Sequence, residues 1–141
     1  DGTPQKEAIP DEWGQAAFVR AMIEGLAGVV DKGVQFSEVE ISPRWYFAGV
    51  DKTSVNIGYG NDGNQVSYSY SFNQKNNKAE IVTSGKFETF TLRFPVPEKA
   101  KSATAVINGK RADVAIEKVN NSRYAVLKGK GNNNRIVFSF R

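Results

Sequence analysis

Residues 11–31 read DEWGQAAFVRAMIEGLAGVVD, and their pattern predicts one long helix. At 100° per residue, Arg20, Glu24 and Asp31 share one narrow sector, whereas apolar side chains occupy much of the remaining circumference. A surface helix normally carries a wider polar face. A sheet packed along one side would leave about half of this apolar surface uncovered. We therefore expect further protein to pack against the other side, and the chain to belong to something larger.

Signals at both ends define the predicted helix. Asp11 is suited to the N-cap, and Glu12 places a negative charge in the first turn, where it favours the helix dipole. Gly25 and Gly28 are expected inside the helix, each at a cost of about 1 kcal/mol relative to alanine. Gly33, directly after Lys32, is expected to end it through a left-handed cap. The preceding ten residues contain two prolines and predict an irregular arm.

From Val34 onward the apolar period changes to two, which is typical of strands. Short alternating segments are separated by turns rich in asparagine and glycine, residues that tolerate positive φ angles. The fold class predicted is mainly β: an antiparallel β-sandwich of about nine strands preceded by one N-terminal α-helix. The nine predicted strands are residues 34–41, 53–59, 65–72, 78–83, 87–94, 102–107, 112–119, 124–129 and 135–140.

Composition excludes much of enzyme chemistry. The chain of 141 residues is the size of one domain, and it contains no histidine and no cysteine. Zinc sites built from those residues, thiol nucleophiles, disulfides and Ser-His-Asp triads are therefore impossible within it. Carboxylates, lysines, tyrosines and hydroxyls remain, and among them we single out no catalytic residue, no metal site and no cofactor site. The longest apolar run is far short of the roughly 20 residues that cross a bilayer, so no membrane span is expected.

Charge is unevenly distributed along the chain. Residues 1–85 carry 7 basic and 11 acidic side chains, a net charge of −4, whereas residues 86–141 carry 12 basic and 4 acidic ones, a net charge of +8. A basic half can mark a nucleic-acid surface. Here the basic residues stand singly among strands and turns, without the aromatic spacing of a recognition motif, so solvated strand edges are favoured and nucleic-acid binding is not expected.

Aromatic residues outside the helix have two possible roles. Trp45 and Tyr46 follow Pro43 in a predicted loop, where they could pack between domains or form a platform for a sugar ring. Tyr68 and Tyr70 share a strand face with apolar residues, which favours the core. The carboxylates at positions 38 and 40 share a strand face as well, and we expect them to face solvent.

Several segments resemble one class of glycosidase. Residues 12–16 (EWGQA) and 23–29 (IEGLAGV) look like the last inner helix of the six-hairpin (α/α)6 toroid glycoside hydrolases, α-rhamnosidase-like and related. In that class a segment similar to residues 39–43 (VEISP) follows the helix and leads into a C-terminal β-sandwich. Residues 105–110 (AVINGK) and 135–140 (RIVFSF) are similar to the close of those sandwiches.

The resemblance implies two regions and an absent reaction centre. Residues 1–33 would be an arm and the end of a toroid-like domain, and residues 34–141 the β-sandwich domain. Glycosidic hydrolysis uses two carboxylates, which the resemblance places in the toroid, outside this chain. Asp11, Glu12 and Trp13 would lie at the substrate side, where Trp13 could stack on a sugar and Glu12 could hydrogen-bond its hydroxyls. As alternatives, Asp11 caps the helix, Glu12 favours its dipole and Trp13 staples it to the sheet.

The sequence as a whole predicts a non-catalytic C-terminal accessory domain that braces the catalytic domain of a glycoside hydrolase. Its partner would be the rest of the parent enzyme, or a second copy through the helix, and possible ligands are carbohydrates. We expect no activity from this chain alone. The alternative is a free-standing carbohydrate-binding or cell-surface adhesion module that uses Trp45 and Tyr46. The expected location is periplasmic or extracellular in a bacterium.

Overall fold

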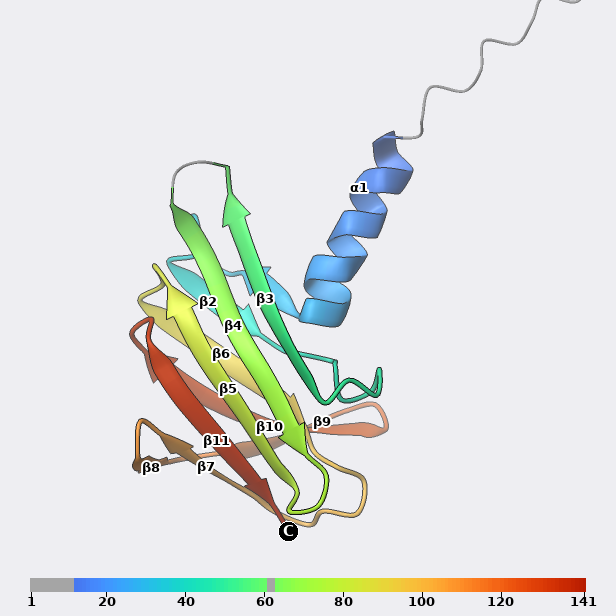
Figure 1. Cartoon of the computed structure of the whole chain (residues 1–141), viewed down its shortest axis with the longest axis vertical. Helices are drawn as coiled ribbons and strands as arrows, with labels where there is room; N and C mark the ends of the chain where they lie inside the picture. The colour runs from blue at the N-terminus through green and yellow to red at the C-terminus, as the bar shows by residue number, and fades with distance from the viewer. Residues whose placement is uncertain (1–11, 61–62) are drawn as a thin grey trace, which may run out of the picture.

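The computed structural model describes residues 12–60 and 63–141, so Asp11, the N-terminal arm and part of the predicted turn after Tyr59 lie outside it. A helical segment leads into two packed sheets (Figure 1). The segment consists of α1 (Glu12–Arg20) and a continuing π-helical stretch, η1 (Ala21–Ala27). In Figure 1 it projects from the side of the sandwich at which β3 lies, and only its C-terminal end meets the sheets. The predicted fold class is confirmed.

Eleven strands form the two sheets of the described chain. The five-stranded sheet has the order β1-β2-β6-β10-β9, and the six-stranded sheet has the order β3-β4-β5-β11-β7-β8. Neighbours pair in antiparallel fashion, except that β2 runs parallel to β6. The strands are β1 (Val29–Asp31), β2 (Glu38–Ile41), β3 (Lys52–Tyr59), β4 (Asn64–Asn73), β5 (Lys78–Gly85), β6 (Thr89–Pro95), β7 (Ala103–Ile107), β8 (Lys110–Ala112), β9 (Ala115–Val119), β10 (Ser122–Lys130) and β11 (Asn134–Phe140).

The core between the sheets is rich in aromatic rings. Phe94 of β6 is fully buried, and its ring centroid lies 6.0 Å from that of Tyr70. The rings of Phe138 and Phe140 lie 5.7 and 5.5 Å from it on the opposite sheet. These rings come from alternating positions of their strands, because successive side chains point to opposite faces of a sheet. The predicted core role of Tyr68 and Tyr70 is confirmed, since both are buried.

The helix ends earlier than predicted. It stops at Ala27, and Gly28 adopts a left-handed conformation with φ of 70°, where its N–H donates to the carbonyl of Ile23. The next residues form β1, in which Val29 is buried and pairs with Ile41. The prediction that Gly28 lies within the helix and that Gly33 caps it was therefore wrong. A glycine readily adopts the left-handed conformation that commonly ends a helix, and here the following residues join the five-stranded sheet as its edge strand.

The first predicted strand is also shorter than expected. Only Glu38–Ile41 of the predicted 34–41 is strand, because Gln35 and Phe36 have positive φ angles of 51° and 64° and make a turn. This turn buries the Phe36 side chain. The resulting strand β2 is the element that pairs in parallel with β6, so the expectation of a wholly antiparallel sandwich fails at this pair.

The predicted strand 112–119 is two strands in different sheets. Ala112 ends β8, which pairs with β7 in the six-stranded sheet, whereas Ala115 begins β9, which pairs with β10 in the five-stranded sheet. The chain crosses from one layer to the other at Asp113 and Val114. This crossing and strand β1 account for the difference between nine predicted strands and eleven.

Candidate functional site

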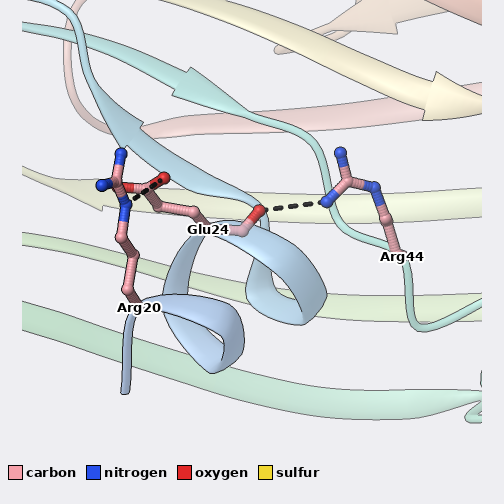
Figure 2. A network of polar contacts seen from close by, with 3 residues as sticks. All are labelled: Arg20, Glu24 and Arg44. Atoms are coloured by element: carbon pink, nitrogen blue, oxygen red, sulfur yellow. Dashed lines mark hydrogen bonds and ion pairs between the residues drawn. The ribbon is translucent and has the colours of Figure 1, made fainter. Parts of the chain in front are cut away.

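The C-terminal end of the helical segment is held by the loop after β2. The last carbonyls of a helix lack partners within it. Here Nη1 of Arg44 donates to the carbonyl oxygens of Glu24, at 3.0 Å, and of Gly25. The backbone N–H of Arg44 donates to the carbonyl of Leu26 at 3.0 Å. Figure 2 shows the guanidinium of Arg44 facing the Glu24 carbonyl, while the Glu24 side chain turns away toward Arg20.

A second set of bonds fixes the next two carbonyls. The hydroxyl of Tyr68 on β4 donates to the Ala27 carbonyl at 2.6 Å and accepts from the indole N–H of Trp45 at 2.8 Å. The N–H of Ser42 donates to the Gly28 carbonyl at 2.7 Å. Burial raises the pKa of Tyr68 far above its usual range, so the hydroxyl stays protonated and able to donate. The helix is therefore attached rigidly at one end.

The other part of the helix presents apolar side chains to solvent. Phe18 is 67% exposed, Val19 53% and Met22 43%, whereas Ile23 packs on the core. An exposed ion pair joins Nε of Arg20 to a carboxylate oxygen of Glu24 at 3.0 Å (Figure 2). We call the surface formed by Phe18 and Met22, one helical turn apart, the outer face of the helix. Monomeric proteins seldom leave such adjacent large apolar residues uncovered, so this surface has the character of a docking site.

A groove of about 710 Å³ runs beside this face. One wall is the helix, through residues that include Val19 and Ile23, and the other comes from β1 and β3, through residues that include Val30 and Ile57. β1 and β3 are edge strands of different sheets, so the groove opens where the two layers end. The helix thus stands beside the open side of the sandwich, and a partner could contact helix and sheet edges together.

The two N-terminal site predictions cannot be placed in full. Glu12 and Trp13 lie in the first turn of α1, but their side chains are outside the described part of the structure, as is Asp11. Their role in contacting a sugar remains a prediction.

The structure separates the roles of Trp45 and Tyr46. The Trp45 indole points to Tyr68 and belongs to the helix attachment. The Tyr46 ring packs edge-on against Phe72, with centroids 4.9 Å apart, and lines a pocket of about 430 Å³ with Phe47. Phe47 was missed as a candidate, although it directly follows the two aromatic residues that the sequence singled out. Arg123 of the same pocket is distant in sequence, and no local pattern points to it.

The remaining candidate features are a metal site, a membrane-spanning helix and the carboxylates at positions 38 and 40, and the described residues support neither of the first two. Within residues 12–60 and 63–141 no three metal-binding side chains of the His, Cys, Asp or Glu types gather at one place. None of the described helices is long and apolar enough to span a membrane. Glu38 is exposed and Glu40 is half-buried, with its carboxylate 3.8 Å from Nζ of Lys32, which agrees with the expected solvent-facing position.

Comparison with known proteins gives structural matches alone. No protein-family model matches the sequence, and no curated protein does. Among solved structures, a GH127 β-L-arabinofuranosidase from Geobacillus stearothermophilus T6 matches 91% of this chain with a TM-score of 0.55 and 16% identity. An α-L-rhamnosidase from Dictyoglumus thermophilum matches 82% of it with a TM-score of 0.51 and 12% identity.

These matches concern a small part of each enzyme. The aligned region is 18% of the arabinofuranosidase chain and 12% of the rhamnosidase chain. The expected structural similarity to glycoside hydrolases is therefore confirmed. At these identities the similarity extends to the fold, which in both enzymes is one portion of a much longer chain.

Proposed function

We propose that this chain is a non-catalytic accessory domain that braces the catalytic domain of a glycoside hydrolase. The observation that carries the proposal is the exposed outer face of the helix, on a fold that two glycosidases contain as a small part of their length. An apolar and uncovered surface on a fixed element is typical of an interaction site. The catalytic carboxylates would lie in the partner domain, and this chain alone would hydrolyse nothing.

The geometry suggests how such bracing would work. The Arg44, Tyr68 and Trp45 bonds fix the C-terminal end of the helix to the sandwich. Burial of a large apolar side chain contributes about 1.5–3 kcal/mol, so covering Phe18 and Met22 would hold a second domain against this helix. Because the helix is anchored before docking, little conformational entropy would be lost on association.

In this arrangement the N-terminal turn of α1 would face the partner domain. Glu12 and Trp13 would then be placed to contact substrate, as the family resemblance implies. A periplasmic or extracellular location also remains a prediction.

Sedimentation velocity of the 141-residue chain tests the docking surface. Without its partner the outer face stays in water, so the chain should self-associate as concentration rises. The double substitution Phe18→Ser/Met22→Ser should restore a monomer, because it replaces two exposed apolar side chains by hydroxyls.

The matched control is Ile116→Ser/Val119→Ser. These residues are 46% and 45% exposed on β9, at the edge of the five-stranded sheet opposite β1. This variant should associate like the unaltered chain. A chain that stays monomeric at every accessible concentration, or association that the β9 variant abolishes and the helix variant does not, would contradict the proposed docking face.

A further inference from the structure

A second hollow lies at the loop after β2, away from the outer face of the helix. Its volume is about 430 Å³, and it shares no lining residue with the groove beside the helix. The turn after Pro43 supplies Tyr46 and Phe47, and the start of β10 supplies Arg123. Glu98, from the connection between β6 and β7, and Asn121 complete the polar part. Aromatic and hydrogen-bonding groups therefore meet in one concave surface.

The aromatic wall is held in place before any ligand arrives. Tyr46 packs edge-on against Phe72 with 4.9 Å between centroids, and Phe47 packs edge-on against Tyr46 at 5.7 Å. The backbone N–H of Phe47 donates to the carbonyl of Arg44 at 3.0 Å, which fixes the turn. Phe47 nevertheless remains 57% exposed. A fixed and exposed aromatic ring offers an apolar surface on which the C–H face of a sugar can pack.

The polar wall is equally fixed. Nη2 of Arg123 donates to the carbonyls of Glu98, at 3.0 Å, and of Ala100, at 2.7 Å. The Arg123 carbonyl accepts from the N–H of Val96 at 2.8 Å. The guanidinium is therefore held in place. Within residues 12–60 and 63–141 only its Nη2 is hydrogen-bonded, which leaves Nη1 and Nε for a ligand, and the exposed residue Glu98 adds a carboxylate acceptor. One positive and one negative side chain give the pocket no net charge.

We propose that this pocket binds a single neutral sugar residue, stacked on Phe47 and hydrogen-bonded by Glu98, Asn121 and Arg123. Sugar hydroxyls both donate and accept, so they suit a wall that offers a carboxylate, an amide and a guanidinium together. Because the charges of Glu98 and Arg123 cancel, an anionic sugar would gain no net electrostatic attraction over a neutral one. The proposal does not depend on the bracing role, because the pocket and the outer face of the helix are separate surfaces.

The test is a titration of the ¹⁵N-labelled 141-residue chain with individual sugars, followed by amide chemical shifts. The neutral probes are L-rhamnose, L-arabinose, D-galactose, D-xylose and D-glucose, and the anionic probe is D-galacturonate. At least one neutral sugar should cause saturable shifts confined to residues near 46–48, 96–98 and 121–123. A ligand of this size in an open pocket should bind with a dissociation constant of about 1 mM.

Three variants decide whether the pocket is responsible. Phe47→Ala removes the stacking surface and Glu98→Gln removes the charged acceptor, and each should weaken binding about tenfold. Ile116→Ala is the matched control, since it truncates another exposed apolar side chain, outside both the pocket and the outer face of the helix, and should leave affinity unchanged. An unaltered amide spectrum elsewhere shows that each variant is folded. Absence of saturable shifts with every neutral sugar, preference for galacturonate, or unchanged affinity in both pocket variants would overturn the proposal.

Discussion

Two tyrosines on the same face of β4 have opposite consequences for stability. The Tyr68 hydroxyl makes two hydrogen bonds, to Ala27 and from Trp45. The Tyr70 hydroxyl is buried and finds no hydrogen-bond partner among the described residues. A buried polar group without a partner carries its desolvation cost uncompensated, whereas a bonded one leaves other groups unpaired when it is removed. Residues that look equivalent in sequence are therefore not equivalent in energy.

The pair Tyr68→Phe and Tyr70→Phe measures this difference. Loss of the Tyr68 hydroxyl leaves the Ala27 carbonyl and the Trp45 N–H unpaired, and the free energy of unfolding should fall by about 2 kcal/mol. Loss of the Tyr70 hydroxyl should leave the free energy unchanged or raise it slightly. Urea unfolding of both variants measures these changes in the free energy of unfolding. Equal losses in the two variants would contradict the assigned bonding.

The same burial makes stability depend on alkaline pH. Desolvation raises the pKa of both Tyr68 and Tyr70 far above their usual value near 10. Above about pH 10 the unfolded chain releases these protons while the folded chain keeps them, so the free energy of unfolding falls as pH rises. Each tyrosine contributes about 1.4 kcal/mol per pH unit.

Unfolding curves between about pH 9 and about pH 11 measure this slope. Tyr70→Phe should remove about half of the tyrosine contribution, because one of the two shifted groups is gone. A slope identical to that of the unaltered chain would show that Tyr70 ionises in the folded protein.

The junction between η1 and β1 shows what a pattern along the chain can and cannot predict. The helix and its surplus apolar surface follow from local spacing, and the exposed Phe18, Val19 and Met22 agree with it. The position at which the helix ends does not follow from local spacing, because it depends on residues distant in sequence. Gly28 is a cap because the chain around Ser42 and Arg44 comes close enough to bind the last carbonyls. The apolar spacing along the helix does not indicate which distant segment will contact its last carbonyls.

Gly28→Ala and Gly25→Ala test the junction. At Gly28 the φ angle is 70°, and an added Cβ would lie 1.9 Å from the Ser42 carbonyl oxygen. The left-handed conformation alone costs an alanine about 1–2 kcal/mol, and the overlap with backbone adds to it. At Gly25 an added Cβ meets nothing within 4 Å, so alanine should stabilise the helix by up to about 1 kcal/mol.

Thermal unfolding of the two variants measures the difference in their stability. Gly28→Ala should lower the melting temperature and Gly25→Ala should raise or preserve it. Destabilisation of the Gly25 variant as large as that of the Gly28 variant would contradict the position of the helix end.

At the scale of the whole molecule, the alternation of apolar and polar residues predicts which segments are strands, but it does not predict which of the two sheets each strand joins. Apolar residues at alternate positions over 112–117 predict one strand, yet the chain changes sheet at Asp113 and Val114, because the pattern is the same for either sheet. The pocket of Tyr46, Phe47 and Arg123 was likewise beyond sequence reasoning, since it forms only when the loop after β2 meets the start of β10. Exposure of one side of the helix, in contrast, was predictable from its own composition. The expected packing of a sheet along its other side was wrong, because residues 14–22 are all exposed and only the C-terminal turn of the helix meets the sandwich.

The central claim, that the chain braces the catalytic domain of a glycoside hydrolase, is tested most directly upstream of Asp1 in the source gene. We predict that the reading frame continues there for a region much longer than this chain, with helical-hairpin periodicity and a pair of carboxylates suited to glycosidic hydrolysis. A start codon or an export signal directly before the codon for Asp1 would contradict the claim, and the outer face of the helix would then need another partner.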